Sequence, residues 1–170
     1  ADHQSTDRTR EILTKLRVEG LPIHMESVTA ARHVQAETMT RLLQEAANRE
    51  KADLILPIDA DEFLLPRGDR SVRQALQSLS MDSVCSIHIY PYALQREEGL
   101  VPGRFLLDAP LCHAQVPMPT QRIVLDGDFV RREHVVIGEG NHGISLGKGF
   151  FTGPFLTDVF YAHFPWRSRL

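Results

Sequence analysis

The sequence predicts an α/β fold built on an open, mostly parallel sheet with helices on both faces. Two observations lead to this prediction. Helical and strand-like segments alternate through the first third of the chain, and the series ends in a near-continuous apolar run, residues 53–58, which is typical of a parallel strand buried on both faces. In sheets of this kind, ligands bind in the crevice at the carboxyl ends of the strands. A polar cluster that follows such a strand is therefore a candidate site.

The first helix begins after an N-cap, either Thr6 or Asp7, in the segment RTREILTKLRV. Apolar residues recur there at helical spacing, and Gly20 ends the helix. The segment IHMESV, residues 23–28, then predicts a short strand.

A long amphipathic helix is expected over residues 31–51, before the apolar strand at 53–58. Another helix is predicted over residues 71–80, and a strand over 84–90. The order of elements indicates βαβ units.

The second half of the chain has weaker periodicity. Residues 91–120 are rich in proline and are predicted to form a long loop region that shapes a binding site. Short strands are expected to follow at residues 122–125, 135–137 and 159–163.

Composition limits the possible functions. The chain has 170 residues, of which 42% are hydrophobic and 24% charged, with a formal net charge of −3. We expect one domain, and neither nucleic acid nor anionic lipid as a partner, because the basic residues form no patch. Cys85 and Cys112 lie far apart, which favours a reducing, cytoplasmic setting. No run is long and apolar enough for a membrane-spanning helix.

Three carboxylates, Asp59, Asp61 and Glu62, lie within four residues directly after the apolar strand, in the stretch LILPIDADEFLLP. Like charges this close repel one another, and apolar neighbours add a desolvation cost. A hard divalent cation, Mg²⁺ or Mn²⁺, would cancel the repulsion and take phosphate oxygens as further ligands. The alternative is that Asp59 and Asp61 only cap the next turn.

The segment DHQSTDRT near the N-terminus resembles the D-D-G-S-T-D-G-T turn of family 2 glycosyltransferases. The order helix, strand, helix, strand and then IDADEFL also resembles that family, as do GNHG at 140–143 and the terminal HFPWRS. The chain is most similar to the branch whose motif reads D-x-D-E-F. In the first turn, five positions match and three depart: Asp2, Ser5, Thr6, Asp7 and Thr9 against His3, Gln4 and Arg8.

The resemblance implies a GT-A fold and transfer of a sugar from a nucleotide-diphosphate donor, with inversion at the anomeric carbon. It implies that Asp2 contacts the base or ribose of the donor and that Asp7 is the second acidic position of the turn, although Asp7 also suits a helix cap. Asp59 matches the position near the ribose and the metal, and Asp61 the direct metal ligand. Glu62 either orients Asp61 or binds the donor sugar.

Other residues are weaker candidates. His163 matches the late histidine that completes the metal shell in GT-A enzymes, and His142 is a lesser candidate in a glycine-rich turn. Arg167 is expected to meet the diphosphate, since a guanidinium matches phosphate geometry. An inverting displacement needs a general base. The candidates are Asp108, Asp126, Asp128 and Glu139.

Alternatives remain open. A nucleotidyltransferase or phosphohydrolase would also use Asp59 and Asp61, and a non-catalytic sugar-nucleotide-binding module would keep the fold without turnover. The acceptor, whether glycan, lipid or another molecule, is not specified by the sequence. Because a strand is expected upstream of Ala1, we interpret residues 1–170 as one GT-A-like domain truncated at the N-terminus and incomplete at the C-terminus.

Overall fold

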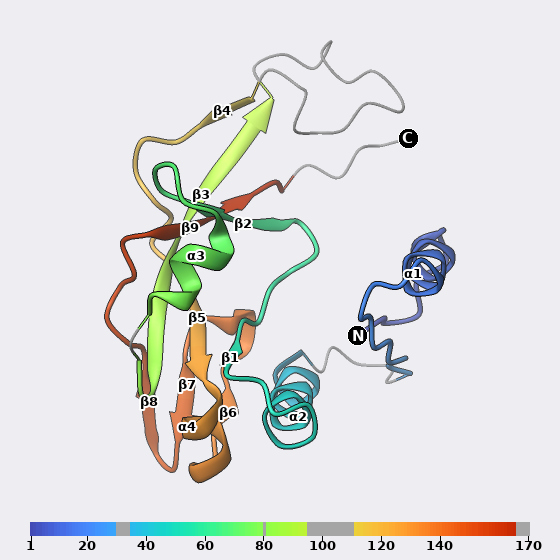
Figure 1. The fold of residues 1–170 in the computed structure, drawn as a ribbon, viewed down its shortest axis with the longest axis horizontal. Coiled ribbons are helices and arrows are strands. Elements are labelled where there is room, and N and C mark those ends of the chain that lie inside the picture. Colours follow the sequence, from blue (N-terminus) through green and yellow to red (C-terminus); the bar gives the residue numbers. More distant parts are fainter. Residues whose placement is uncertain (30–34, 80, 95–110, 166–170) are drawn as a thin grey trace.

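The computed structural model describes residues 1–29, 35–79, 81–94 and 111–165 of the chain. Its main body is a twisted sheet with helices on both faces (Figure 1). Within these residues, no helix has the length and apolar character needed to cross a membrane.

The described residues form one sheet of six strands, in the order β1-β5-β3-β9-β2 with β4 beside β3. The pairs β1–β5, β3–β5, β3–β4 and β2–β9 are antiparallel, and β3–β9 alone is parallel. The mixed α/β character is confirmed, but the expectation of a mostly parallel sheet is wrong. The strands are β1 (Leu54–Ile55), β2 (Glu62–Pro66), β3 (Val84–Leu94), β4 (Leu111–His113), β5 (Gln121–Asp126) and β9 (Val159–His163).

A second, three-stranded antiparallel sheet follows β5 in the chain, in the order β6-β7-β8. Helix α3 packs on one face of the main sheet, while α2 and α4 pack with β6 on the other. The remaining elements are α1 (Thr9–Val18), α2 (Gln35–Asn48), α3 (Val72–Gln77), α4 (Gly127–Arg132), β6 (Val136–Ile137), the 3₁₀ turn η3 (Glu139–Asn141), β7 (Ile144–Leu146) and β8 (Gly149–Phe151).

Strand β5 supplies side chains to both cores because successive residues of a strand point to opposite faces. Ile123 and Leu125 join the cluster under α2, and Val124 joins the cluster under α3. All three are fully buried, and each buried aliphatic side chain stabilises the fold by about 1.5–3 kcal/mol. The neighbouring residue of β5, Arg122, is thereby fixed to a rigid element.

Strand β1 differs most from its prediction. It covers only Leu54–Ile55 of the expected 53–58, it is antiparallel to β5, and it is half-buried at the edge of the sheet. Pro57 explains the early end, since proline has no backbone N–H for a ladder. The strand that is buried on both faces is β5.

Several helix and strand boundaries also moved. The N-cap of α3 is Ser71, which forms a reciprocal capping box with Gln74, and this helix is shorter than predicted. The expected loop at 91–120 contains the end of β3 and all of β4, and its residues 95–110 lie outside the described ones. Strand β9 covers the predicted residues 159–163.

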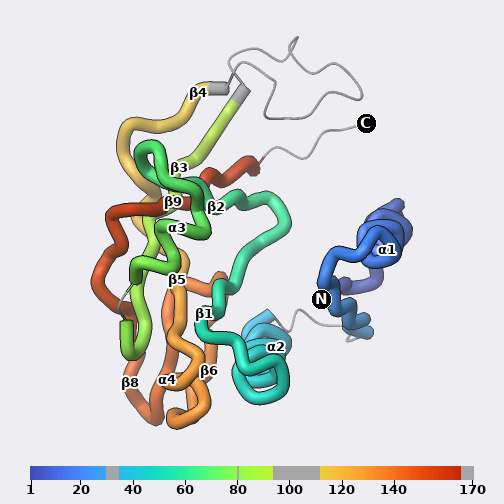
Figure 2. Tube along the Cα trace, viewed as in Figure 1, coloured from blue at the N-terminus to red at the C-terminus, as the bar shows by residue number. Residues whose placement is uncertain are grey.

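The N-terminal segment lies to one side of the sheet (Figures 1 and 2). Helix α1 buries no residue, and the expected strand at 23–28 is reduced to a single parallel bridge between Ser27 and Asp2. Two ion pairs join the N-terminal segment to α2, His24 with Glu45 at 3.8 Å and Glu26 with Arg41.

Candidate metal and donor site

The three clustered carboxylates lie in a tight turn, residues 59–62, which we call the DADE turn. The backbone N–H of Glu62 donates to the carbonyl of Asp59 (3.1 Å), and a Glu62 carboxylate oxygen accepts from the N–H of Asp59 (3.2 Å). Asp is favoured at the first position of such turns. The Glu62 side chain is fully buried, which favours an orienting role over contact with a donor.

Arg122 forms ion pairs with two of the three carboxylates, where the sequence predicted a metal as the counter-charge. Its Nη2 lies 2.7 Å from Asp59 Oδ2 and 2.7 Å from Glu62 Oε1, and its Nε donates to Glu62 Oε2 at 3.0 Å. Only 8% of the Arg122 side chain is exposed. Buried charges are tolerated when they are paired and hydrogen-bonded, as here.

The loop at η3 closes over Arg122 from the other side. Arg122 Nη1 donates to the carbonyl of Gly140, whose φ of +67° favours glycine, and a Cβ there would lie 2.5 Å from the His142 ring. Asn141 is buried and donates to Asp59 Oδ1 (3.3 Å). The two oxygens of Asp59 are therefore held by different partners.

His142 is engaged through Nδ1, which lies 2.7 Å from the Gln121 carbonyl oxygen and 2.9 Å from Arg122 Nη1. One nitrogen cannot donate to the carbonyl and accept from the guanidinium at once, so the tautomer decides which bond forms. With Nδ1 unprotonated, His142 accepts from Arg122, and with Nδ1 protonated it donates to the Gln121 carbonyl instead.

Asp61, the third carboxylate, points away from this network toward β9. Its Oδ2 lies 3.6 Å from His163 Nε2, and its backbone carbonyl accepts from the N–H of Phe164 (2.8 Å). Antiparallel pairing places His163 opposite Glu62, the residue next to Asp61. The structure thus brings together Asp61 and His163, which the sequence analysis proposed as metal ligands on separate grounds.

Asp61 and His163 suit a hard divalent cation. Neighbouring ligands of an octahedral Mg²⁺ or Mn²⁺ lie about 3 Å apart, since each bond is about 2.1 Å long, so the observed 3.6 Å requires little adjustment. In the part of the chain that the structure describes, no group of three or more His, Cys, Asp or Glu side chains is placed to hold a metal ion. A cation here would take two protein ligands, with phosphate or water oxygens as the others.

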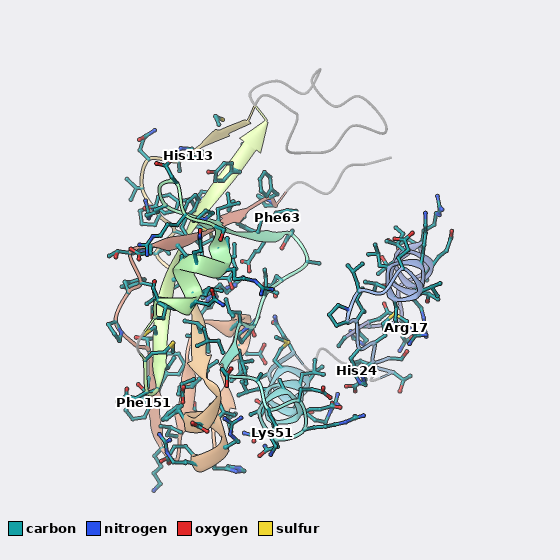
Figure 3. The ribbon with its side chains drawn as sticks, viewed as in Figure 1. Arg17, His24, Lys51, Phe63, His113 and Phe151 are labelled. Atoms are coloured by element: carbon teal, nitrogen blue, oxygen red, sulfur yellow. The ribbon has the colours of Figure 1, made fainter. Side chains whose placement is uncertain are left out.

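Aromatic rings pack together across β2 and the end of β9, on the face of the sheet opposite Glu62 and His163. Phe63 follows Glu62 and Phe164 follows His163, and their rings meet edge to face at 5.4 Å. Tyr92 of β3 packs on Phe164 at 5.2 Å and on His113 of β4 at 5.2 Å. Figure 3 labels Phe63 and His113 at this end of the sheet. This row fixes the strands that carry Asp61 and His163.

The N-terminal acidic residues have local partners. Asp2 is buried, and its Oδ1 accepts from the N–H of Ser5 (3.2 Å), while Oδ2 lies 3.6 Å from Arg10. The Ser5 hydrogen bonds, and then the charge of Arg10, lower the pKa of Asp2. Asp7 accepts from the N–H of Thr9 (2.9 Å), but the N-cap of α1 is Arg8, which makes no side-chain cap hydrogen bond, so the expected N-cap at Thr6 or Asp7 is wrong.

The general-base candidates separate by position. Asp126 caps α4 through the N–H of Phe129 (2.7 Å) and pairs with Leu54, at the other end of β5 from Arg122. Asp126 helps to line a hollow of about 700 Å³ between β1 and α3, which contains no member of the DADE turn. Asp128 pairs with Arg131 on α4, and this hydrogen bond lowers its pKa.

Glu139 is the described candidate on the site's side of the molecule, since it is exposed on η3 beside the Gly140 carbonyl that binds Arg122. Asp108 and Arg167 lie outside the described residues.

Sequence reasoning missed Arg122 and Asn141 as parts of the site. The available signal was the arginine that begins the otherwise apolar segment RIVL. A charged residue in a buried strand requires a partner of opposite charge. Asn141 stood in the GNHG segment, but nothing in its pattern indicated burial. Cys85, which is buried, and Cys112, which is exposed, are both free thiols.

A comparison with protein-family models finds no match, and a comparison with curated proteins finds none either.

Proposed function

We propose that this chain is the donor-binding part of a metal-assisted glycosyltransferase of the GT-A type. It would transfer a sugar from a nucleotide-diphosphate donor to an acceptor hydroxyl, with inversion. The antiparallel pairs of the main sheet depart from the mostly parallel sheet that the resemblance implies, so this proposal depends on the site more than on the topology.

The observation that carries the proposal is the approach of Asp61 to His163. The two residues come from distant parts of the sequence, they are 34% and 21% exposed, and their donor atoms lie 3.6 Å apart. A partly exposed carboxylate directly before β2, beside a partly exposed imidazole on the paired strand β9, provides a two-ligand cation site that leaves positions for a diphosphate.

Each residue then has a distinct task. Asp61 and His163 would hold the Mn²⁺ or Mg²⁺ ion, which when bound neutralises negative charge on the departing diphosphate. Asp59 is one-third exposed and held in orientation by Arg122, which suits a contact with ribose hydroxyls. Glu139 is the described residue best placed to accept a proton from an acceptor. The Asp2 side chain would have to leave its present partners, Ser5 and Arg10, to contact a donor.

Calorimetric titration tests the proposal. The chain is titrated with Mn²⁺, then with a panel of nucleoside diphosphates and nucleotide sugars in Mn²⁺ or in EDTA. We expect at least one nucleoside diphosphate to bind in Mn²⁺ only. Asp61→Asn and His163→Ala should each weaken that binding about 10-fold or more, because each removes one of two protein ligands. Asp128→Asn is the matched control, since this carboxylate lies on α4, which follows the end of β5 away from Arg122.

The panel also separates the alternatives. Slow donor hydrolysis or transfer supports the glycosyltransferase, whereas binding without turnover supports a sugar-nucleotide-binding module. Hydrolysis of nucleoside triphosphates in preference to nucleotide sugars would favour the phosphohydrolase or nucleotidyltransferase. Equal Mn²⁺-dependent binding by the native chain and Asp61→Asn would contradict the proposal.

A further inference from the structure

Arg122 contacts two of the three carboxylates of the DADE turn and leaves the third. The Arg122 guanidinium reaches Asp59 Oδ2 and both oxygens of Glu62, while Asp61 pairs with His163 instead. Arg122 and Glu62 are 8% and 0% exposed in their side chains, so this contact is part of the protein interior. The cluster is therefore divided into a buried half and an open half.

We propose that Arg122 is a resident cation that occupies the place a metal would take between Asp59 and Glu62, and so confines a divalent cation to Asp61 and His163. In this role Arg122 is a positioning residue. The statement that the metal binds at Asp61 and His163 rests on the proposed function. The statement that Arg122 keeps a metal away from Asp59 and Glu62 does not.

Two physical arguments support this division. Asp59 Oδ2 and Glu62 Oε2 already accept charge-assisted hydrogen bonds, at 2.7 and 3.0 Å, and a metal ligand oxygen would have to give these up. The guanidinium also carries a full positive charge, which repels a second cation at short range in a partly buried site. Among the described residues, the ion-pair partner of Asp61 is His163 and no guanidinium, and Asp61 is 34% exposed.

The first experiment removes the resident charge. Arg122→Met keeps an unbranched apolar side chain but removes the guanidinium and its charge, so Asp59 and Glu62 become available to a metal. We expect Mn²⁺ to bind Arg122→Met at least about 10-fold more tightly than it binds the native chain. Calorimetry and electron paramagnetic resonance measure this binding. Mn²⁺ should also raise the melting temperature of Arg122→Met more than that of the native chain.

Two controls define the cause. Arg122→Lys retains the positive charge and should show no gain in Mn²⁺ affinity. Arg70→Met removes an exposed arginine that pairs with Asp158 at 2.7 Å, and it should also show none. A gain in Arg122→Lys equal to that in Arg122→Met would show that packing, rather than charge, controls the affinity.

A double-mutant cycle tests the same idea from the side of Asp59. In the native background, Asp59→Asn should change the Mn²⁺ affinity less than about 3-fold, because Arg122 holds that carboxylate. In the Arg122→Met background, Asp59→Asn should reverse most of the gain. A structural role of Arg122 alone predicts no such coupling.

The outcomes separate this inference from the proposed function. A gain in Arg122→Met is expected whether or not Asp61 and His163 bind a metal in the native chain, and loss of Mn²⁺ response in Asp61→Asn bears on the proposed function alone. The inference is overturned when Arg122→Met neither binds Mn²⁺ more tightly nor is stabilised by it, including failure to fold in Mn²⁺. It is also overturned when Asp59→Asn in the native background weakens Mn²⁺ binding 10-fold or more.

Discussion

The DADE turn and the N-terminal turn, residues 2–7, both present carboxylates, yet different parts of the chain hold them. The DADE turn is fixed by Arg122 from β5, by Asn141 from η3 and by the backbone of Phe164 beyond β9. In the N-terminal turn, Asp2 and Asp7 are held by residues at most eight positions away, apart from the bridge to Ser27.

This difference shows that acidic motifs with similar spacing need not be equally preorganised. Contacts between distant parts of the chain form only when the whole sheet forms, so the DADE turn shares the cooperativity of the fold. The N-terminal turn depends on local hydrogen bonds beside α1, a helix with no buried residue, and such segments open at low free energy. A ligand at the DADE turn meets residues that are already in place.

The largest expected effect comes from removing Arg122. Arg122→Ala leaves Glu62 buried and unpaired, so we expect the free energy of unfolding to fall by about 3–5 kcal/mol. For a chain of this length that corresponds to a melting temperature lower by about 6–20 °C. Arg10→Ala, which removes the exposed partner of Asp2, should leave the melting temperature unchanged. Similar destabilisation by both changes, measured by calorimetry, would remove the distinction between the two turns.

Metal addition and removal give the next effect. At 100 times its dissociation constant, Mn²⁺ should stabilise the native chain by about 2.7 kcal/mol, and excess EDTA should reverse this. Asp61→Asn and His163→Ala should each lose about half of the stabilisation or more, because each removes one ligand of the pair. Asp7→Asn, the matched change in the N-terminal turn, should retain it. A thermal scan in which all three variants respond like the native chain would place the metal elsewhere.

Tyr161→Phe should have a smaller effect near neutral pH. The Tyr161 hydroxyl is buried and has no hydrogen-bond partner among the residues that the structure describes, so its removal should change stability by less than about 1 kcal/mol. Burial, and then the charge of Glu62, raises the pKa of Tyr161 well above its ordinary value of 10.0.

The sign of the alkaline effect follows from that shift. A raised pKa in the folded state stabilises the protein fully below pH 10, and this contribution is lost as the pH rises above 10 toward the folded pKa. Native protein should therefore lose stability above pH 10, as measured by urea unfolding, and Tyr161→Phe should lose less. Identical pH profiles would show that Tyr161 is not buried beside Glu62 in solution.

The elements that periodicity and capping define were predictable from the sequence. Strand β9 and the capping box of α3 at Ser71 are two examples, because neighbouring residues encode each of them. Strand direction was not. A buried apolar run is compatible with parallel and antiparallel partners, and the choice depends on β5, a strand from the far half of the chain.

In the candidate site too, some parts were predictable from the sequence and others were not. Asp61 and His163 were proposed from their motifs, and their approach is a finding of the structure. The counter-charge at Asp59 and Glu62 was assigned to a metal because sequence spacing cannot show that Arg122, sixty residues or more away, reaches both carboxylates. Pairing across the sheet decides this, and a single sequence does not reveal that pairing.

The smallest expected effect is the acid titration of Asp2, which tests whether the N-terminal turn exists in solution. The Ser5 hydrogen bonds and then Arg10 lower the pKa of Asp2 below its ordinary value of 3.8. A lowered pKa contributes stability that is present above pH 3.8 and is lost as the pH falls through the folded value. The Ser5 amide resonance should therefore titrate with a midpoint below 3.8 and should become insensitive to pH in Asp2→Asn. A midpoint at or above 3.8 would show that the turn is open, so that a donor must order it on binding, while the DADE turn needs no such ordering.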